Sequence, residues 1–368
     1  MKQTSGRSRF IRQMIALTIA LILFITSYNL VVSYTVKNMF LTLRKVFFYS
    51  FVFVSTYGVL EILVVYFNVL SLKPILVLFN YVPFVEVSLD FKFLRISSIS
   101  YEPPFLAIYL ITVAGWMFSY IISSKGLKKY IPTLFVFVLT FFSGSRTALI
   151  VVLFQFVIFV GIVFSISKKF RRIIQKLVLL AGCLTILLFI INGKKITEAI
   201  ELKIETLNFK ENLNSNISNK SRFGIQYASL LIFLENPIAG VGFGQQAYHA
   251  KEKYPQWATS DNYEFKLFYL NDQEKSFPPG FNMYTRLLAE TGIIGFGIFV
   301  ILLLLLLYQS RIYIKSKKDQ EKTLSIVLLI SFIGFGINWM QFDSFRIYGF
   351  WICLSLLIAQ VQQRKINE

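Results

Sequence analysis

The chain has 368 residues and a formal net charge of +19, and 55% of its residues are hydrophobic while only 15% are charged. Soluble domains contain about 25% charged residues, so this composition excludes an ordinary soluble globular protein, and it equally excludes a disordered one. In a membrane protein the excess of Lys and Arg reports topology, because basic residues gather in short cytoplasmic loops. No basic tract interleaves with an aromatic platform, so no nucleic-acid partner is expected.

Nine stretches are apolar enough to form membrane-spanning helices, which need about 20 mostly apolar residues. In chain order they are the run between Arg12 and Lys37 and residues 46–68, 103–124, 130–145, 147–167, 177–192, 291–310, 323–342 and 347–363. A tenth stretch, 74–87, is short and contains Pro83 and Glu86, so we expect it to be re-entrant or interfacial. The sequence therefore predicts an all-α, polytopic integral membrane protein with about nine to ten transmembrane helices.

The linkers between these runs predict the orientation of the chain. Linkers 124–129, 168–176 and 311–322 are rich in Lys and Arg and should be cytoplasmic, as should the C-terminal Arg364 and Lys365. Three segments then fall outside, namely 71–102, 143–146 and 193–290. The predicted division is N-terminal transmembrane helices over 1–192, a large extracytoplasmic loop over 193–290, and C-terminal transmembrane helices over 291–368.

The N-terminus conflicts with this orientation. Lys2, Arg7, Arg9 and Arg12 fall outside if the first run crosses the membrane once. The sequence leaves three explanations open: an exception to the positive-inside rule, a miscounted span, or a natural chain that begins further upstream. A signal peptide is not among them, because the apolar region is too long and shows no small-residue cleavage site.

The large outside loop is long enough to be functional, since most connections are shorter than about 15 residues. Its start predicts an amphipathic helix on the membrane, because apolar residues recur there at helical spacing: Ile196, Ile200, Ile204 and Leu207. Residues 212–221 are polar, and we expect them to be flexible. Residues 222–236 predict a second helix, which Pro237 ends.

Three alternating glycines follow this helix, namely Gly240, Gly242 and Gly244. Glycine allows unusual backbone angles and the close approach of a ligand. We interpret the cluster as a candidate phosphate-binding nest, with a plain turn as the alternative. An aromatic-rich stretch lies beyond it, and its side chains can either stack on sugars or lie at the membrane interface: Tyr248, Tyr254, Trp257, Tyr263, Phe265, Phe268 and Tyr269.

Arginines on the outer side give the sharper functional signal. Arg146 lies between two spans with almost no loop, Arg95 precedes the entry to a span, Arg222 begins the loop helix, and Arg286 lies near the next span. A charge near hydrocarbon is costly, and arginine binds phosphate through a planar fork of donors. We therefore predict that they form a site for an anionic, lipid-linked substrate. The alternative for each is interfacial snorkelling or a structural ion pair.

Four segments together resemble the O-antigen ligase/polymerase family of bacterial polysaccharide assembly. They are YEP at 101–103 after Arg95, SGSRTAL at 143–149 around Arg146, NPIAGVGFG at 236–244 after the helix that begins at Arg222, and FN at 281–282 followed by GIIG at 292–295. Each motif is short, but their order and their placement relative to the spans make the match. The resemblance covers roughly residues 95–295.

The resemblance implies an all-helical, GT-C-like membrane glycosyltransferase with its site on the outer face of the bacterial inner, or cytoplasmic, membrane. The donor would be a glycan on undecaprenyl diphosphate, which a polymerase transfers to a second lipid-linked repeat unit and a ligase to lipid A–core. The products are surface polysaccharides such as O-antigen, capsule or exopolysaccharide. Further implied partners are a chain-length regulator and a flippase. Arg95, Arg286, Asn282 and the three glycines are candidate substrate-binding residues.

One departure from the family pattern separates its two activities. Family ligases place a histidine where this chain has Phe281, directly before Asn282. This favours a polymerase, where that histidine is not a fixed requirement, with a ligase as the alternative. The diphosphate leaving group needs charge neutralisation, which Arg146 and Arg222 would supply, and the acceptor hydroxyl needs a general base. Glu102, Glu290 and His249 are the candidates for the base, so these five residues form the predicted catalytic set.

No metal or other cofactor is expected. No two aspartates are spaced as an Asp-x-Asp pair, and the two cysteines, Cys183 and Cys353, both lie in apolar runs. Two other classes remain as alternatives: a transporter or flippase for lipid-linked glycans, which should show internal symmetry and broken mid-membrane helices, and a non-catalytic assembly protein. The polar residues are concentrated in one outside loop, which favours an enzyme.

Overall fold

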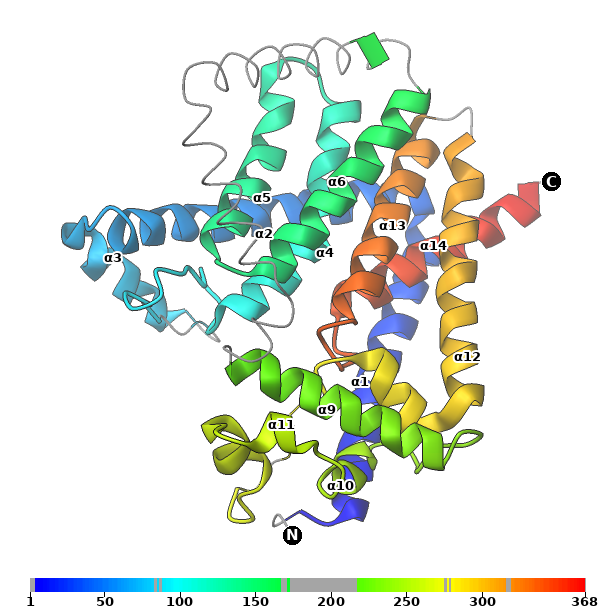
Figure 1. Ribbon diagram of the computed structural model, residues 1–368. Coiled ribbons are helices and arrows are strands. Elements are labelled where there is room, and N and C mark those ends of the chain that lie inside the picture. Colours follow the sequence, from blue (N-terminus) through cyan, green and yellow to red (C-terminus); the bar gives the residue numbers. More distant parts are fainter. Residues whose placement is uncertain are drawn as a thin grey trace, which may run out of the picture. The chain divides into compact units, whose positions relative to one another are not determined.

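A computed structural model describes residues 4–82, 85, 88–166, 171–172, 217–274, 277, 279–315 and 319–367 (Figure 1). Over these residues the protein is all-α, as predicted, and the β-type pairing is confined to an isolated bridge between Asp90 and Arg95. The helices are α1 Gly6–Tyr34, α2 Val36–Val65, α3 Lys73–Leu78, α4 Pro103–Ser123, α5 Ile131–Phe142, α6 Arg146–Ile166, α9 Ile217–Glu235, α10 Gln246–Ala250, α11 Gln256–Thr259, α12 Met283–Ile312, α13 Asp319–Asn338 and α14 Tyr348–Asn367.

Six helices of the described residues are long and apolar enough to cross a membrane: α1, α2, α4, α6, α12 and α13. The 21 residues of α4 correspond to about 32 Å at 1.5 Å per residue, which matches the roughly 30 Å hydrocarbon core. The protein is therefore a multi-pass membrane protein. Two further predicted spans, 130–145 and 347–363, coincide with α5 and α14, but α5 has only 12 residues.

Some predictions fall outside the described residues or on shorter elements. The predicted span 177–192 and the amphipathic helix around Ile200 lie outside the described residues, so the count of nine to ten transmembrane helices stays a prediction. The predicted re-entrant stretch 74–87 contains α3 and a single 3₁₀ turn, Phe79–Tyr81. The structure corrects one expectation: residues 217–221, predicted to be flexible, form the first turns of α9, where Ser221 is fully buried.

Proline sets the start of two helices. Pro103 and Pro104 occupy the first turn of α4, where their missing N–H groups would have no helical partner anyway, and Glu102 precedes them in extended conformation. Pro132 does the same for α5. These local signals explain why both starts were readable from the sequence.

The chain forms two compact units, which we describe separately. The first comprises Met1–Ile15 and Gly161–Ile298, and the second comprises Ala16–Val160 and Phe299–Glu368. The division of the chain into 1–192, 193–290 and 291–368 stays a prediction.

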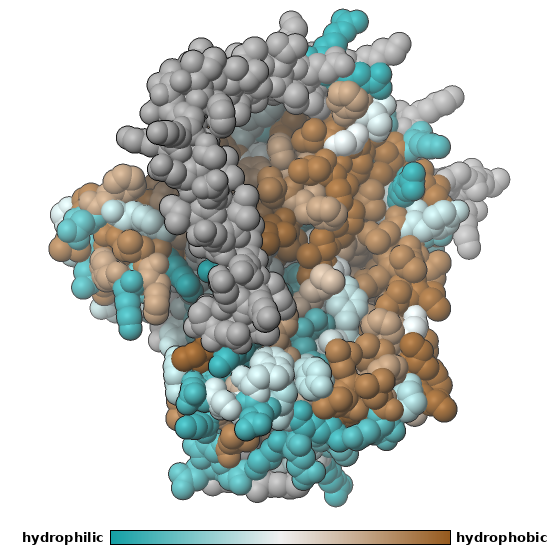
Figure 2. Space-filling view, viewed as in Figure 1, coloured by the Kyte–Doolittle hydropathy of each residue, from teal (hydrophilic) through white to brown (hydrophobic). Residues whose placement is uncertain are grey.

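Hydrophobic side chains cover the exposed face of α12, whereas hydrophilic ones gather over α10 and α11 (Figure 2).

Helix α4 is the centre of the second unit. Trp116 is fully buried, with its ring 4.6 Å from that of Phe47 on α2, and Phe118 packs against Phe137 on α5 and Phe156 on α6. A single amide joins three helices: Nε2 of Gln155 on α6 donates to the carbonyl of Ile111 on α4 and to that of Ile330 on α13. A buried amide nitrogen that donates two such bonds links helices where the hydrophobic effect between them is weak.

Candidate functional site

The described part of the large loop is a folded lobe with its own core. Helix α9 buries Ile225, Ala228 and Ile232 against residues of α10, α11 and α12. Asn262 fixes the N-terminal end of α9, because the amide of Asn262 donates to Ser221 Oγ at 3.0 Å and to the carbonyl of Ala258 at 2.9 Å. The side chains carried by this lobe are therefore fixed by packing.

The aromatic stretch divides between this core and the surface. Phe265 and Tyr269 are buried, with Tyr254 packed against them, and burial raises the pKa of Tyr254. These three side chains thus form a core, whereas stacking on sugars and lying at the membrane interface were the two roles expected for them. Trp257 and Tyr263 stay exposed, and the ring of Trp257 lies 6.4 Å from that of Tyr227 on α9. Only the exposed members remain available to a glycan.

The glycine cluster packs its backbone against a break in α12. Gly292 leaves the helical conformation with φ 62°, so the hydrogen bonds that would pass through this turn of α12 are not made. Residues 237–242 supply the missing partners: Val241 N donates to Ala289 O at 3.0 Å, Gly242 N to Glu290 O at 2.9 Å, and Ile293 N to Pro237 O at 2.8 Å. The loop thus completes the hydrogen bonding of the interrupted helix.

Two of the glycines make this approach possible. A Cβ at Gly240 would collide with the main chain of Glu290 and Thr291, and one at Gly292 would collide with the carbonyl of Ile238. Both residues also have positive φ, which an L side chain rarely adopts. A structural reason therefore accounts for Gly240, and a phosphate-binding role for Gly240, Gly242 and Gly244 stays a prediction.

Arg286 and Glu290 form an ion pair beside this break. Nε of Arg286 lies 3.1 Å from Oε1 of Glu290, and the two side chains are 6% and 0% exposed. The guanidinium carbon of Arg286 also lies 5.7 Å from the ring centre of Phe243. Buried charges persist in proteins when they are paired, so this is the geometry of a structural ion pair. Glu290 is fully buried in this pair, so its carboxyl group would have to become accessible before it could act as a base on a substrate hydroxyl.

Arg222, which belongs to α9, lies in a different environment, next to the start of α12. Its guanidinium carbon is 5.1 Å from the ring centre of Phe281, and the side chain is half-buried. Its Nε has no hydrogen-bond partner among the described residues. The cation–π contact therefore holds the arginine in place and leaves a buried donor available to a ligand.

Asn282 connects Arg222 to the α12 terminus. Its Oδ1 accepts from the backbone N–H groups of Tyr284 at 2.9 Å and Thr285 at 3.2 Å, which is an N-cap. Its Nδ2 donates to Gln226, one turn after Arg222 on α9, at 3.4 Å. A helix N-terminus carries positive potential, so this end of α12 and the Arg222 guanidinium together attract an anion.

Sequence reasoning missed Arg9, which reaches this lobe from the start of α1. Its Nε donates to the carbonyl of Gly244 at 2.7 Å, and its guanidinium carbon lies 4.8 Å from the ring centre of Phe277. Gln245 donates back to the carbonyl of Gly6 at 3.1 Å. The available signal was the conflict between the basic N-terminus and the positive-inside rule.

The second unit holds another group of predicted site residues: Arg95, Glu102 and Arg146. The stem of Arg95 lies on the turn before Arg146, since its Cγ would be 2.9 Å from a Cβ at Gly144, and Ile96 N donates to Phe142 O at 3.1 Å. Arg146 begins α6, and all three side chains are exposed. Glu102 and Arg95, both described, do not form an ion pair with each other.

Glu61 fixes the segment that carries Arg95. Its fully buried carboxyl group accepts from Ser97 N at 3.1 Å and from Ser98 N at 2.7 Å. The sequence offered one signal for it, as the single charge in a predicted span. His249, by contrast, is exposed on α10. The structure thus groups Arg222 with Asn282, Arg286 with Glu290, and Arg95 with the turn before Arg146, and convergence of these groups stays a prediction.

These features define a multi-pass, all-helical membrane protein with a folded arginine-bearing lobe. Residues 131–300 match the family model described as O-antigen ligase. The chain therefore carries a domain of the O-antigen ligase/polymerase family, which confirms the resemblance, and the family implies a membrane glycosyltransferase-like enzyme that works with lipid-linked glycans. The matched region contains Arg146, Arg222, Asn282 and the glycine cluster. No curated protein matches the chain.

Proposed function

We propose that this protein polymerises undecaprenyl-diphosphate-linked oligosaccharide repeat units into a surface polysaccharide, by glycosyl transfer on the outer face of the bacterial cytoplasmic membrane. The observation that carries the proposal is Arg222, whose half-buried guanidinium lies against Phe281 with an Nε that has no partner among the described residues. A diphosphate is the chemical group in such a substrate that this donor and the adjacent helix N-terminus suit.

The reaction forms one bond and breaks one. An acceptor sugar hydroxyl attacks the anomeric carbon of the donor, and the bond from that carbon to the diphosphate oxygen breaks. Undecaprenyl diphosphate leaves with the electron pair, and the hydroxyl proton passes to a base, for which Glu102 and His249 are exposed candidates and Glu290 a buried one. The arginines neutralise the charge that develops on the leaving group, so we propose that no metal ion is required.

Two observations support the side of the membrane and the acceptor. Because Gly6 and Arg9 contact Gly244 and Gln245, the start of α1 accompanies the lobe, which supports a topology in which the basic N-terminus and the lobe are both external and the C-terminus is cytoplasmic. The exposed pair of Tyr227 and Trp257 offers an aromatic surface on which an acceptor sugar can stack.

The matched family model is described by its ligase activity, so transfer of a finished polymer to lipid A–core is the second candidate. Phe281 favours the polymerase, because it stands where family ligases have histidine. The test is incubation of the purified full chain with an undecaprenyl-diphosphate repeat unit, with EDTA, in the presence and absence of lipid A–core. A ladder of lengths without lipid A–core supports the polymerase, and product only with lipid A–core overturns it. Arg146→Ala tests whether the exposed arginine of α6 belongs to the site.

A further inference from the structure

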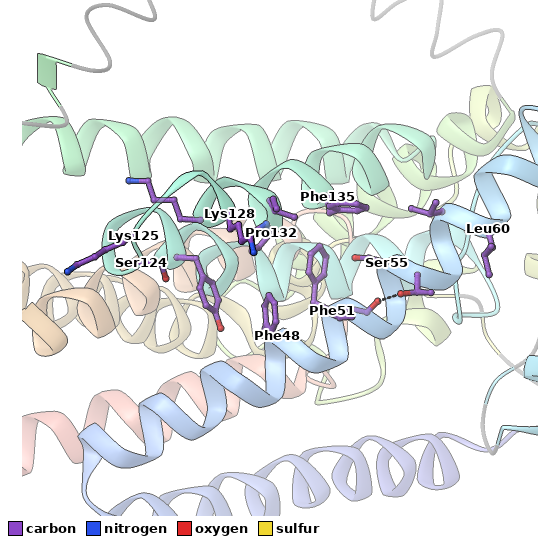
Figure 3. A pocket seen from close by; sticks show the side chains of 15 residues that line it. Phe48, Phe51, Ser55, Leu60, Ser124, Lys125, Lys128, Pro132 and Phe135 are labelled. Carbon is purple, nitrogen blue, oxygen red and sulfur yellow. Dashed lines mark hydrogen bonds between the residues drawn. The ribbon is translucent and has the colours of Figure 1, made fainter.

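A cavity of ≈ 670 Å³ lies between α2 and α5 in the second unit, and its lining includes none of the candidate site residues. Its wall is formed by one face of α2, the start of α5 and the linker between α4 and α5 (Figure 3). The α2 residues that line it run from Phe48 to Leu60 at helical spacing, which corresponds to about 18 Å along the helix axis. The cavity is thus an elongated groove along a membrane-spanning helix, and we call it the α2–α5 groove.

The two ends of the groove differ in chemistry. Lys125 and Lys128 line one end, and the side chains of Phe51, Phe135 and Leu60 extend the wall toward the other (Figure 3). Lys129, next to Lys128 in the same linker, also lines the groove. Lys125 and Lys128 are exposed. All fifteen lining residues are described, and none of them is acidic. An amphiphile with a negative head and an apolar tail complements this arrangement.

A polar group inside the groove has no hydrogen-bond partner among the described residues. The side chain of Ser55 is 7% exposed, and its hydroxyl makes no hydrogen bond within the described residues. The neighbouring Thr56, by contrast, donates to the carbonyl of Val52 in its own helix at 2.9 Å. A buried hydroxyl without a partner is costly, and a carbonyl oxygen of an ester-linked lipid can accept from it.

We propose that the α2–α5 groove binds one anionic phospholipid, with its headgroup phosphate on the three lysines and an acyl chain along α2. The lysines belong to a linker that the sequence predicts to be cytoplasmic, and the cytoplasmic leaflet is the one rich in anionic lipid. Basic pockets between transmembrane helices on that side bind such headgroups. This proposal does not depend on the proposed glycosyl transfer.

The test is native mass spectrometry of the purified full chain in detergent, with dioleoyl phosphatidylglycerol or dioleoyl phosphatidylcholine added. We expect phosphatidylglycerol to bind at about tenfold lower concentration than phosphatidylcholine. Each lysine near a surface contributes roughly fivefold, so three lysines would give about 125-fold, and screening by salt reduces this preference. The triple variant Lys125→Gln, Lys128→Gln, Lys129→Gln should lose this preference. The matched control is Arg311→Gln, Lys315→Gln, Lys322→Gln, which removes the same charge from another linker and should retain it.

Two further arms separate the groove from a simple basic patch. Thr56→Trp, or Val52→Trp if the first does not fold, places a large side chain at an exposed position of the groove wall and should weaken the binding of both lipids. Millimolar glycerol 1-phosphate, which has the headgroup chemistry without a chain, should not displace phosphatidylglycerol. Equal loss in the two charge variants, unchanged binding in the tryptophan variant, or displacement by glycerol 1-phosphate would each overturn the proposal.

Discussion

Two regions of α12, its break and its start, each contact an arginine in a different way. At the break in α12, Arg286 is buried and paired with Glu290. At the start of α12, Arg222 is half-buried, rests on Phe281, and keeps an Nε without a partner among the described residues. A charge that is paired with a buried counter-charge supports the fold, whereas a charge that rests on an aromatic ring and has no carboxylate partner among the described residues suits a ligand. The sequence analysis placed both arginines in the substrate site, Arg222 as a catalytic residue and Arg286 as a substrate-binding one.

The largest effect should come from removing the ion pair of Arg286 and Glu290 beside the break in α12. Glu290→Gln leaves the Arg286 guanidinium buried without its counter-charge, and we expect a loss of about 3–5 kcal/mol in the free energy of unfolding. Chemical denaturation in detergent measures it. The double variant Arg286→Met, Glu290→Leu should recover most of the loss, because it removes both charges. A Glu290→Gln protein of wild-type stability would show that the pair is not structural.

Matched lysine substitutions sharpen the comparison at the level of activity. Arg222→Lys should lower the rate of the proposed polymerisation about 100-fold, or about 2.7 kcal/mol, because lysine keeps the charge but loses the forked donors. Its unfolding midpoint should stay unchanged. Arg286→Lys should instead lower stability before it lowers activity per folded molecule. The same pattern in both variants would remove the distinction between the two regions.

A glycine pair tests the break itself. Gly292→Ala forces a side chain into positive φ and into the carbonyl of Ile238, and we expect a loss of about 2–3 kcal/mol. Gly297→Ala is the control on the same helix, since a Cβ there meets nothing within 4 Å and should be neutral or slightly stabilising. Thermal unfolding followed by tryptophan fluorescence compares the two. If they behave alike, the break does not need glycine.

The smallest expected effect concerns the start of α1. Arg9→Ala removes the hydrogen bond to Gly244 and should cost about 1.5 kcal/mol, typical of a bond with one charged partner. Arg12→Ala changes an exposed arginine three residues on and should stay within about 0.5 kcal/mol. Hydrogen exchange of the backbone N–H groups of residues 244–245 reports whether this turn is still held in place. Equal protection in both variants would mean that Arg9 does not hold the lobe.

Local signals in the sequence predicted much of the fold. Proline placed the start of α4 and the end of α9, and the charge-free runs located α1, α6 and α13. Helix α9 began earlier than predicted, and Ser221 in its first turns is buried and hydrogen-bonded to Asn262, which lies far along the chain. Polarity alone suggested flexibility, and the tertiary contact overrode it.

The geometry around the candidate site was less readable, because its partners are distant in sequence. The four-residue spacing of Arg286 and Glu290 was a local signal for their ion pair. No local sequence signal indicated that Gly240 packs beside Gly292, and none in the first apolar run indicated that Arg9 reaches Gly244. Hydrogen bonds and close backbone contacts between separate segments require the fold before they can be recognised.

The interruption at Gly292 also bears on how the protein is made. Helix α12 cannot enter a bilayer at low cost while the amide and carbonyl groups around its interruption face hydrocarbon unsatisfied. Residues 237–242 supply the hydrogen-bond partners of these groups, and they lie between α9 and α12 in the sequence, so they are synthesised before α12. We therefore expect α12 to insert with this earlier segment packed against its interruption, because displacing residues 237–242 would leave these polar groups unsatisfied.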